Sequence, residues 1–171
     1  MSILIGCEAF YKVYLDLEER LGPGGIVDKP IEDPLPAMYC IPVKVNGAFA
    51  AELALKALLY AANIPYETKN GHQLEYLFHL LPATEKIELN KRFHQLIDIT
   101  DEQILANLRN ISNTFNEQRY LFDTIGHNHP NYVFFKHFVH TLCDYVLYID
   151  VPISEDTSKP QLDDCPYMTS S

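Results

Sequence analysis

Residues 48–59 read AFAAELALKALL, and this stretch decides the fold. Ten of its twelve residues are apolar, and they surround the helix instead of following one face. A helix that is apolar on all sides has to be covered on all sides, so the stretch predicts the central helix of a bundle. Its two charged residues, Glu52 and Lys56, are four apart with the acid first, which favours an ion pair.

Apolar residues at helical spacing predict further helices on both sides of this centre. We expect helices over residues 2–21, 48–63, 72–81, 82–97, 100–122 and 131–149. Thr100 and Gln103 are typical of a capping box at a helix start. Residues 22–46 are rich in proline, and we expect a crossover loop there. The sequence therefore predicts an all-α bundle of five or six helices, forming one domain over residues 1–150.

Length and charge restrict the class of protein. A chain of 171 residues suits one domain with one core. Residues 151–171 are acidic and polar, so we expect a disordered tail there. The net charge of −10 gives little long-range attraction for phosphate backbones, which argues mildly against nucleic acid as a partner.

The distribution of apolar residues and cysteines predicts a cytoplasmic protein without membrane contact. No apolar run reaches the roughly 18 residues that a membrane span needs, and the first residues lack the basic region of a signal peptide. The four cysteines are widely spaced and include no C-x-x-C pair, which is typical of reduced thiols.

Three motifs follow one another along residues 45–149. They are Glu52-Leu53-Ala54-Leu55-Lys56, His72-Gln73-Leu74-Glu75-Tyr76-Leu77 and Phe115-Asn116-Glu117-Gln118-Arg119-Tyr120. In this order they resemble the HEPN family (higher eukaryotes and prokaryotes nucleotide-binding domain). Members of that family are helical bundles and often dimers, so the resemblance implies a HEPN-like bundle and a homodimer. It also implies structural roles for Glu52, Lys56 and His72.

Many HEPN proteins are metal-independent endoribonucleases that carry an Arg, a polar residue and then a His, spaced as R-x(4–6)-H. Arg109 and Asn110 match the opening pair, but other residue types occupy the positions expected for the histidine. The resemblance therefore implies a binding or interaction module without catalysis, in a setting such as prokaryotic defence, stress or toxin–antitoxin systems. The alternative is a divergent endoribonuclease acting on RNA through Arg109, Asn110 and Glu52. Arg119 or His127 would then replace the missing histidine.

Two partners are open for the acid of the central helix. A buried carboxylate needs a compensating charge. Lys56 can supply it from the same helix, whereas Arg109 or Arg119 would supply it from across the bundle. For His72 the simplest interpretation is a structural, hydrogen-bonded side chain.

The last predicted helix and the turn before it hold the densest group of metal-ligand residue types. These are His127, His129, His137, His140, Cys143 and Asp144. We expect no metal site, because Phe138, Val139 and Leu142 occupy the inward stripe of that helix. We also expect no cofactor, because no glycine-rich phosphate motif follows a strand. Additional aromatic residues on this helix predict an exposed patch and a homodimer through the last two helices.

Overall fold

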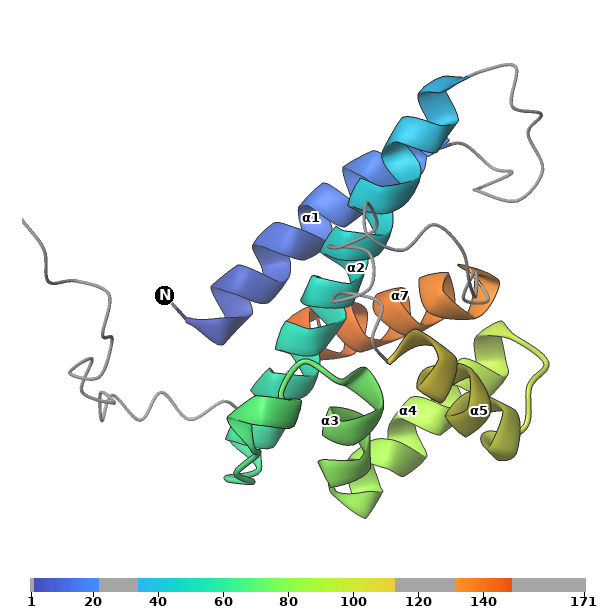
Figure 1. The fold of residues 1–171 in the computed structure, drawn as a ribbon. Helices are drawn as coiled ribbons and strands as arrows, with labels where there is room; N and C mark the ends of the chain where they lie inside the picture. Colours follow the sequence, from blue (N-terminus) through green and yellow to red (C-terminus); the bar gives the residue numbers. More distant parts are fainter. Residues whose placement is uncertain (1, 22–33, 113–131, 149–171) are drawn as a thin grey trace, which may run out of the picture.

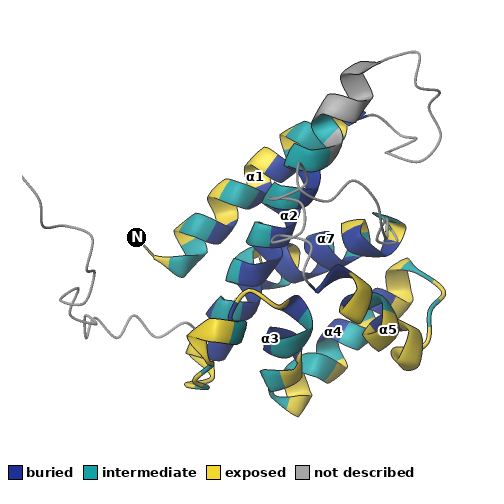
Figure 2. Cartoon of the chain, in the orientation of Figure 1, coloured by how far each residue is buried: buried dark blue, intermediate teal, exposed yellow. Residues whose placement is uncertain are grey.

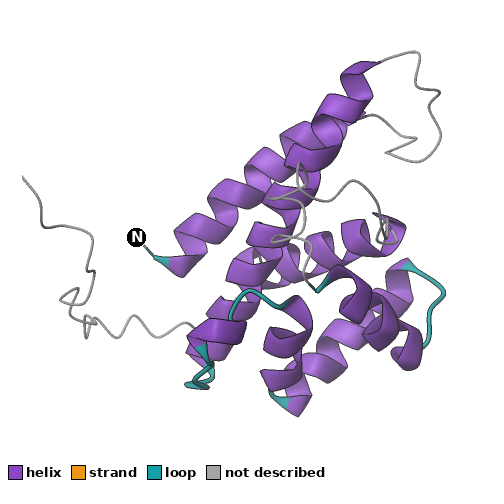
Figure 3. Cartoon of the chain, viewed as in Figure 1, coloured by secondary structure: helices purple, strands orange, loops and turns teal. Residues whose placement is uncertain are grey.

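The computed structural model describes residues 2–21, 34–112 and 132–148 (Figure 1). Within these ranges the chain is helical and contains no strand (Figure 3). The α-helices are α1 (Ile3–Leu21), α2 (Pro34–Ala61), α3 (Leu74–Leu80), α4 (Ala83–Leu96), α5 (Asp101–Ile111) and α7 (Tyr132–Tyr148), with a 3-10 turn, η1, at Thr68–Asn70. The predicted all-α bundle is confirmed. Among these described helices, none combines the length and apolar character needed to cross a membrane.

The quoted stretch lies in α2, at the centre of the bundle. α1 runs antiparallel along α2, and α7 and α3 pack against other sides of it (Figure 1). Figure 2 shows buried residues along α2 and α7, where the helices face one another. The buried members of the stretch are Ala48, Ala50, Ala51, Glu52, Ala54, Leu55, Ala57, Leu58 and Leu59. Each buried leucine side chain contributes about 1.5–3 kcal/mol, and the alanines let the neighbouring helices approach closely.

The prediction of a crossover loop over residues 22–46 is wrong for residues 34–46, which form the first turns of α2. Pro34 occupies the first helical position, where the missing N–H would have no intrahelical partner in any case. Pro42 lies inside the helix, and its carbonyl oxygen accepts a hydrogen bond from the side-chain amide of Asn46 at 2.7 Å. Residues 22–33 and the predicted tail, 151–171, lie outside the described residues.

Gly47 marks the place where α1, α2 and α7 meet. A Cβ atom at this position would lie 2.8 Å from the ring of Tyr14 and 3.1 Å from the ring of Phe135. Both rings are fully buried, so neither can move away without disturbing the core. The close approach of three helices therefore requires a glycine here.

The predicted helix boundaries are largely confirmed. Just after α2, Asn63 has a left-handed φ of 53°, and the N–H of Ile64 donates to the carbonyl of Leu59 at 2.9 Å. At the start of α5, the Thr100 hydroxyl accepts from the N–H of Gln103 at 3.3 Å, and the Gln103 side chain accepts from the N–H of Thr100 at 2.9 Å. The predicted capping box is therefore present.

α5 ends before Phe122, so the predicted end of this helix is wrong. The residue after the helix, Ser112, instead binds the start of α3. Its carbonyl accepts from the N–H of Leu74 at 3.1 Å, and its hydroxyl accepts from the N–H of Glu75 at 3.0 Å. Ser112 thus supplies acceptors for two backbone N–H groups in the first turn of α3, which have no partner within that helix. Residues 113–131 lie outside the described residues.

The aromatic residues of α7 lie mostly inside the bundle. Phe134, Phe135 and Phe138 are fully buried, and Phe138 stacks on Phe93 of α4 with 5.8 Å between ring centroids. Tyr148 is exposed at the end of the helix. The predicted aromatic patch on this helix is therefore wrong, and the homodimer remains a prediction without that support.

Candidate functional site

The carboxylate of Glu52, in the central helix α2, is paired with side chains that lie close to it. Glu52 is 1% exposed, and Nζ of Lys56 lies 2.7 Å from its Oε1. Nδ1 of His72 lies 3.1 Å from both of its carboxylate oxygens. Lys56 also lies over the ring of Tyr66, 5.4 Å from the centroid. The predicted Glu52–Lys56 pair is therefore present, and His72 is the second partner.

The other candidates for a nuclease site do not join this cluster. Nε of Arg109 lies 3.1 Å from Oε1 of Glu75, in a side chain that is 72% exposed. The proposed contact between Arg109 and Glu52 is therefore wrong. Asn110 is exposed beside Arg109 on α5. Arg119 and His127 lie outside the described residues.

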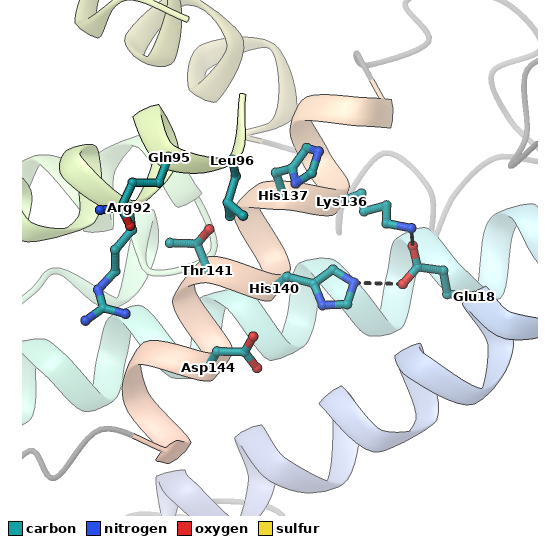
Figure 4. A pocket seen from close by; sticks show the side chains of 9 residues that line it. All are labelled: Glu18, Arg92, Gln95, Leu96, Lys136, His137, His140, Thr141 and Asp144. Carbon is teal, nitrogen blue, oxygen red and sulfur yellow. Dashed lines mark hydrogen bonds and ion pairs between the residues drawn. The ribbon is translucent and has the colours of Figure 1, made fainter. Parts of the chain in front are cut away.

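A second group of charged side chains surrounds a cavity of about 450 Å³ between α1, α4 and α7 (Figure 4). The residues that line it are Glu18, Arg92, Gln95, Leu96, Lys136, His137, His140, Thr141 and Asp144. This volume falls within the range typical of small-molecule sites. We call it the α1–α4–α7 pocket.

Glu18 holds α1 against α7 at the edge of this pocket. Its Oε1 lies 2.6 Å from Nζ of Lys136, and its Oε2 lies 2.8 Å from Nε2 of His140 (Figure 4). Partial burial by itself raises the pKa of Glu18, but the hydrogen bonds from His140 and Lys136 outweigh it and hold that pKa below its usual value. The carboxylate is thus ionised at neutral pH.

The opposite side of the His140 ring is bound to Tyr11. The Tyr11 hydroxyl lies 2.9 Å from Nδ1 of His140 and donates to Oδ1 of Asp144 at 2.8 Å. The Tyr11 hydroxyl thus links the His140 ring to Asp144, while the other ring nitrogen, Nε2, lies 2.8 Å from Glu18. Burial, and then the bond to Asp144, raise the pKa of Tyr11 far above its usual value.

Arg92 forms the α4 side of the pocket. Its Nε lies 3.1 Å from Oε1 of Glu88, and its guanidinium lies over the ring of Tyr145 at 5.1 Å from the centroid. The Tyr145 hydroxyl in turn donates to Glu85 at 2.6 Å. These contacts fix the guanidinium plane while its terminal nitrogens have no partner among the described residues.

Three residues of this pocket, His137, His140 and Asp144, belong to the group of metal-ligand residue types in the sequence, for which we expected no metal site. Burial and the nearby positive charges of His140 and Lys136 lower the pKa of His137, so its ring is neutral near pH 7. Within the described ranges no three His, Cys, Asp or Glu side chains are placed to hold a metal ion.

Cys143, the remaining described member of that group, is turned away from the pocket. It is fully buried, and burial followed by the neighbouring Cys7 raises its pKa well above the usual value. Both cysteines are free thiols. Cys143 therefore packs as a small apolar residue and takes no part in the site.

The chain was compared with protein-family models, curated proteins and solved structures. No protein-family model, no curated protein and no solved structure matches the chain. The resemblance to the HEPN family thus rests on the motifs quoted from the sequence, and the function has to be argued from the geometry of the side chains.

Proposed function

We propose that the chain is a HEPN-like helical module that binds a ligand or partner in the cytoplasm without catalysing a reaction. The observation that carries this proposal is where the unpaired hydrogen-bonding groups lie. Unpaired groups of Arg92, Gln95, His137 and Thr141 lie together in the α1–α4–α7 pocket, whereas the nuclease candidates Glu52 and Arg109 are each paired elsewhere.

The paired state of these two candidates supports a structural role for them. Stabilising charge in a transition state requires groups that converge on one reacting atom. Glu52 instead neutralises Lys56 and contacts His72, and Arg109 neutralises Glu75 at the surface. A setting in prokaryotic defence, stress or toxin–antitoxin systems is supported by the resemblance alone.

Incubation with RNA in EDTA tests the absence of catalysis. We expect the full chain to leave a pool of structured and single-stranded RNAs intact. Arg109→Ala and Arg119→Ala serve as the site variants, and Arg20→Ala is the matched control, since Arg20 forms an exposed pair with Asp16 on α1 at 3.1 Å. Cleavage that survives the chelator, disappears in either site variant and persists in the control would overturn the proposal in favour of a divergent endoribonuclease.

The homodimer is part of the same proposal and has its own test. Size-exclusion chromatography with light scattering is expected to give twice the mass of one chain. A mass equal to one chain across the concentration range would remove the dimer while leaving the binding role unaffected.

A further inference from the structure

The α1–α4–α7 pocket has more unpaired hydrogen-bond donors than acceptors. The guanidinium of Arg92 uses only Nε in a hydrogen bond, and Lys136 uses one of its three N–H groups for Glu18. Gln95 and His137 have no hydrogen-bond partner among the described residues. On the acceptor side, Glu18 is paired with Lys136 and His140, and one oxygen of Asp144 accepts from Tyr11.

A buried hydroxyl strengthens this imbalance. Thr141 is 5% exposed, and its Oγ1 has no hydrogen-bond partner in the structure. The side chain extends from α7 toward α4 and lines the pocket (Figure 4). A buried hydroxyl without a partner is costly, so this group favours a ligand that brings an acceptor close to it.

The charged side chains of the lining also favour an anion. Both carboxylates are already engaged, because Glu18 is paired with Lys136 and His140, and Asp144 accepts from Tyr11. The guanidinium of Arg92 uses only Nε in a hydrogen bond, and the Lys136 side chain is 46% exposed. An anion would therefore meet charged donors that have N–H groups left to give.

We propose that the α1–α4–α7 pocket binds the oxyanion group, phosphate or carboxylate, of a small molecule. Arg92 and Lys136 supply the charged donors, Gln95 and His137 supply neutral ones, and Thr141 donates from the floor. The inference rests on the proposed binding function and names the chemistry of the ligand. The size of the cavity leaves room for an organic portion against Leu96.

Titration of the full chain with inorganic phosphate, followed by ¹⁵N–¹H NMR at constant ionic strength, tests the site. We expect saturable shifts of the amides around Gln95 and Thr141, and a parallel titration with acetate separates phosphate from carboxylate preference. Arg92→Gln is expected to weaken affinity about tenfold, because it removes a charge-assisted hydrogen bond. The matched control is Lys91→Gln, which removes an exposed charge from the same helix and leaves the affinity within about twofold.

Thr141→Val gives a second and independent readout. Valine has nearly the same shape but no hydroxyl, so the unfolding midpoint of the free protein is expected to stay equal or rise. Phosphate affinity is expected to fall several-fold at the same time. A merely structural hydroxyl would lower stability and leave affinity unchanged, and that pair of results would overturn its role in binding.

The two proposals fail in different experiments. Absence of saturable binding by either anion, or binding that Arg92→Gln and Thr141→Val both leave unchanged, overturns the oxyanion site. If the same protein leaves RNA uncleaved, the proposal of a non-catalytic binding module is retained. Conversely, RNA cleavage would overturn the proposed function even where phosphate binds.

Discussion

Among the residues that the structure describes, two clusters have the same composition, one Glu, one Lys and one His, in different surroundings. In the first cluster Glu52 binds Lys56 on its own helix and His72 just before α3. In the second cluster Glu18 of α1 binds Lys136 and His140 of α7, and His140 is 122 positions further along the chain. The first cluster spans 20 positions of the sequence and includes a pair on one helix, whereas the second joins two helices across 122 positions.

The difference in exposure assigns a different role to each cluster. The Lys56 side chain is 15% exposed, so it has little contact with solvent beyond its pairing with the carboxylate. The Lys136 side chain is 46% exposed and borders a cavity with unpaired donors. We infer that the Glu52 cluster stabilises the bundle and that the Glu18 cluster both joins two helices and prepares a binding site.

The largest expected effect comes from Glu52→Gln. Removing this charge leaves Lys56 mostly buried without a counter-ion, and we expect a loss of about 2–4 kcal/mol in the free energy of unfolding. Urea denaturation measures it, with Glu8→Gln as the control, because Glu8 forms an exposed pair with Lys12 that contributes under about 1 kcal/mol. Equal values for the two variants would contradict a structural role for Glu52.

Glu18→Gln is expected to have the next largest effect. It removes charge-assisted bonds from Lys136 and His140, but the exposed Lys136 can be hydrated afterwards. We therefore expect a loss of about 1–2 kcal/mol in the free energy of unfolding, measured by the same urea titration. A loss larger than that of Glu52→Gln would reverse the comparison between the two clusters.

The contribution of Glu18 is also expected to depend on pH. Its pKa is lower in the folded chain than the ordinary 4.5, because the bonds from His140 and Lys136 outweigh partial burial. A depressed carboxyl pKa stabilises the fold above the ordinary pKa, and the contribution disappears as pH falls through the folded value. The stability difference between wild type and Glu18→Gln should thus shrink below about pH 4.5. A difference that grows as the pH falls would show that the carboxylate is not the stabilising form.

The smallest expected effect is that of Arg109→Ala. Its pair with Glu75 is at the surface, with the arginine side chain 72% exposed. Such pairs contribute about 0–1 kcal/mol, and urea denaturation is expected to show a change within that range. A loss above about 2 kcal/mol would indicate that Arg109 belongs to the core architecture.

The features that could be predicted from the sequence are local ones. An acid and a base four residues apart on a helix are neighbours wherever the helix lies, so the Glu52–Lys56 pair was predictable. The Thr100 capping box was predictable for the same reason. The start of α2 was not, because Pro36 and Pro42 suggested a loop where packing of the helix overrides the cost of an internal proline.

The features that could not be predicted depend on which helices pack together. His137, His140 and Asp144 were identified as a cluster, but nothing in their spacing shows that Tyr11, Glu18 and Arg92 approach them. These partners come from α1 and α4, and their positions are set by the packing of both helices against α7. Tyr11 is buried and hydrogen-bonded on α1, and a hydrophobic pattern does not distinguish such a side chain from an ordinary core aromatic residue.

The measurement that tests the central claim most directly is a phosphate titration of wild type, Lys136→Gln and Lys56→Gln. Both variants remove one lysine from a Glu–Lys–His cluster. If the α1–α4–α7 pocket is the binding site, Lys136→Gln weakens phosphate affinity about tenfold and Lys56→Gln leaves it within about twofold. Equal affinities for all three proteins, or a loss confined to Lys56→Gln, would contradict the account.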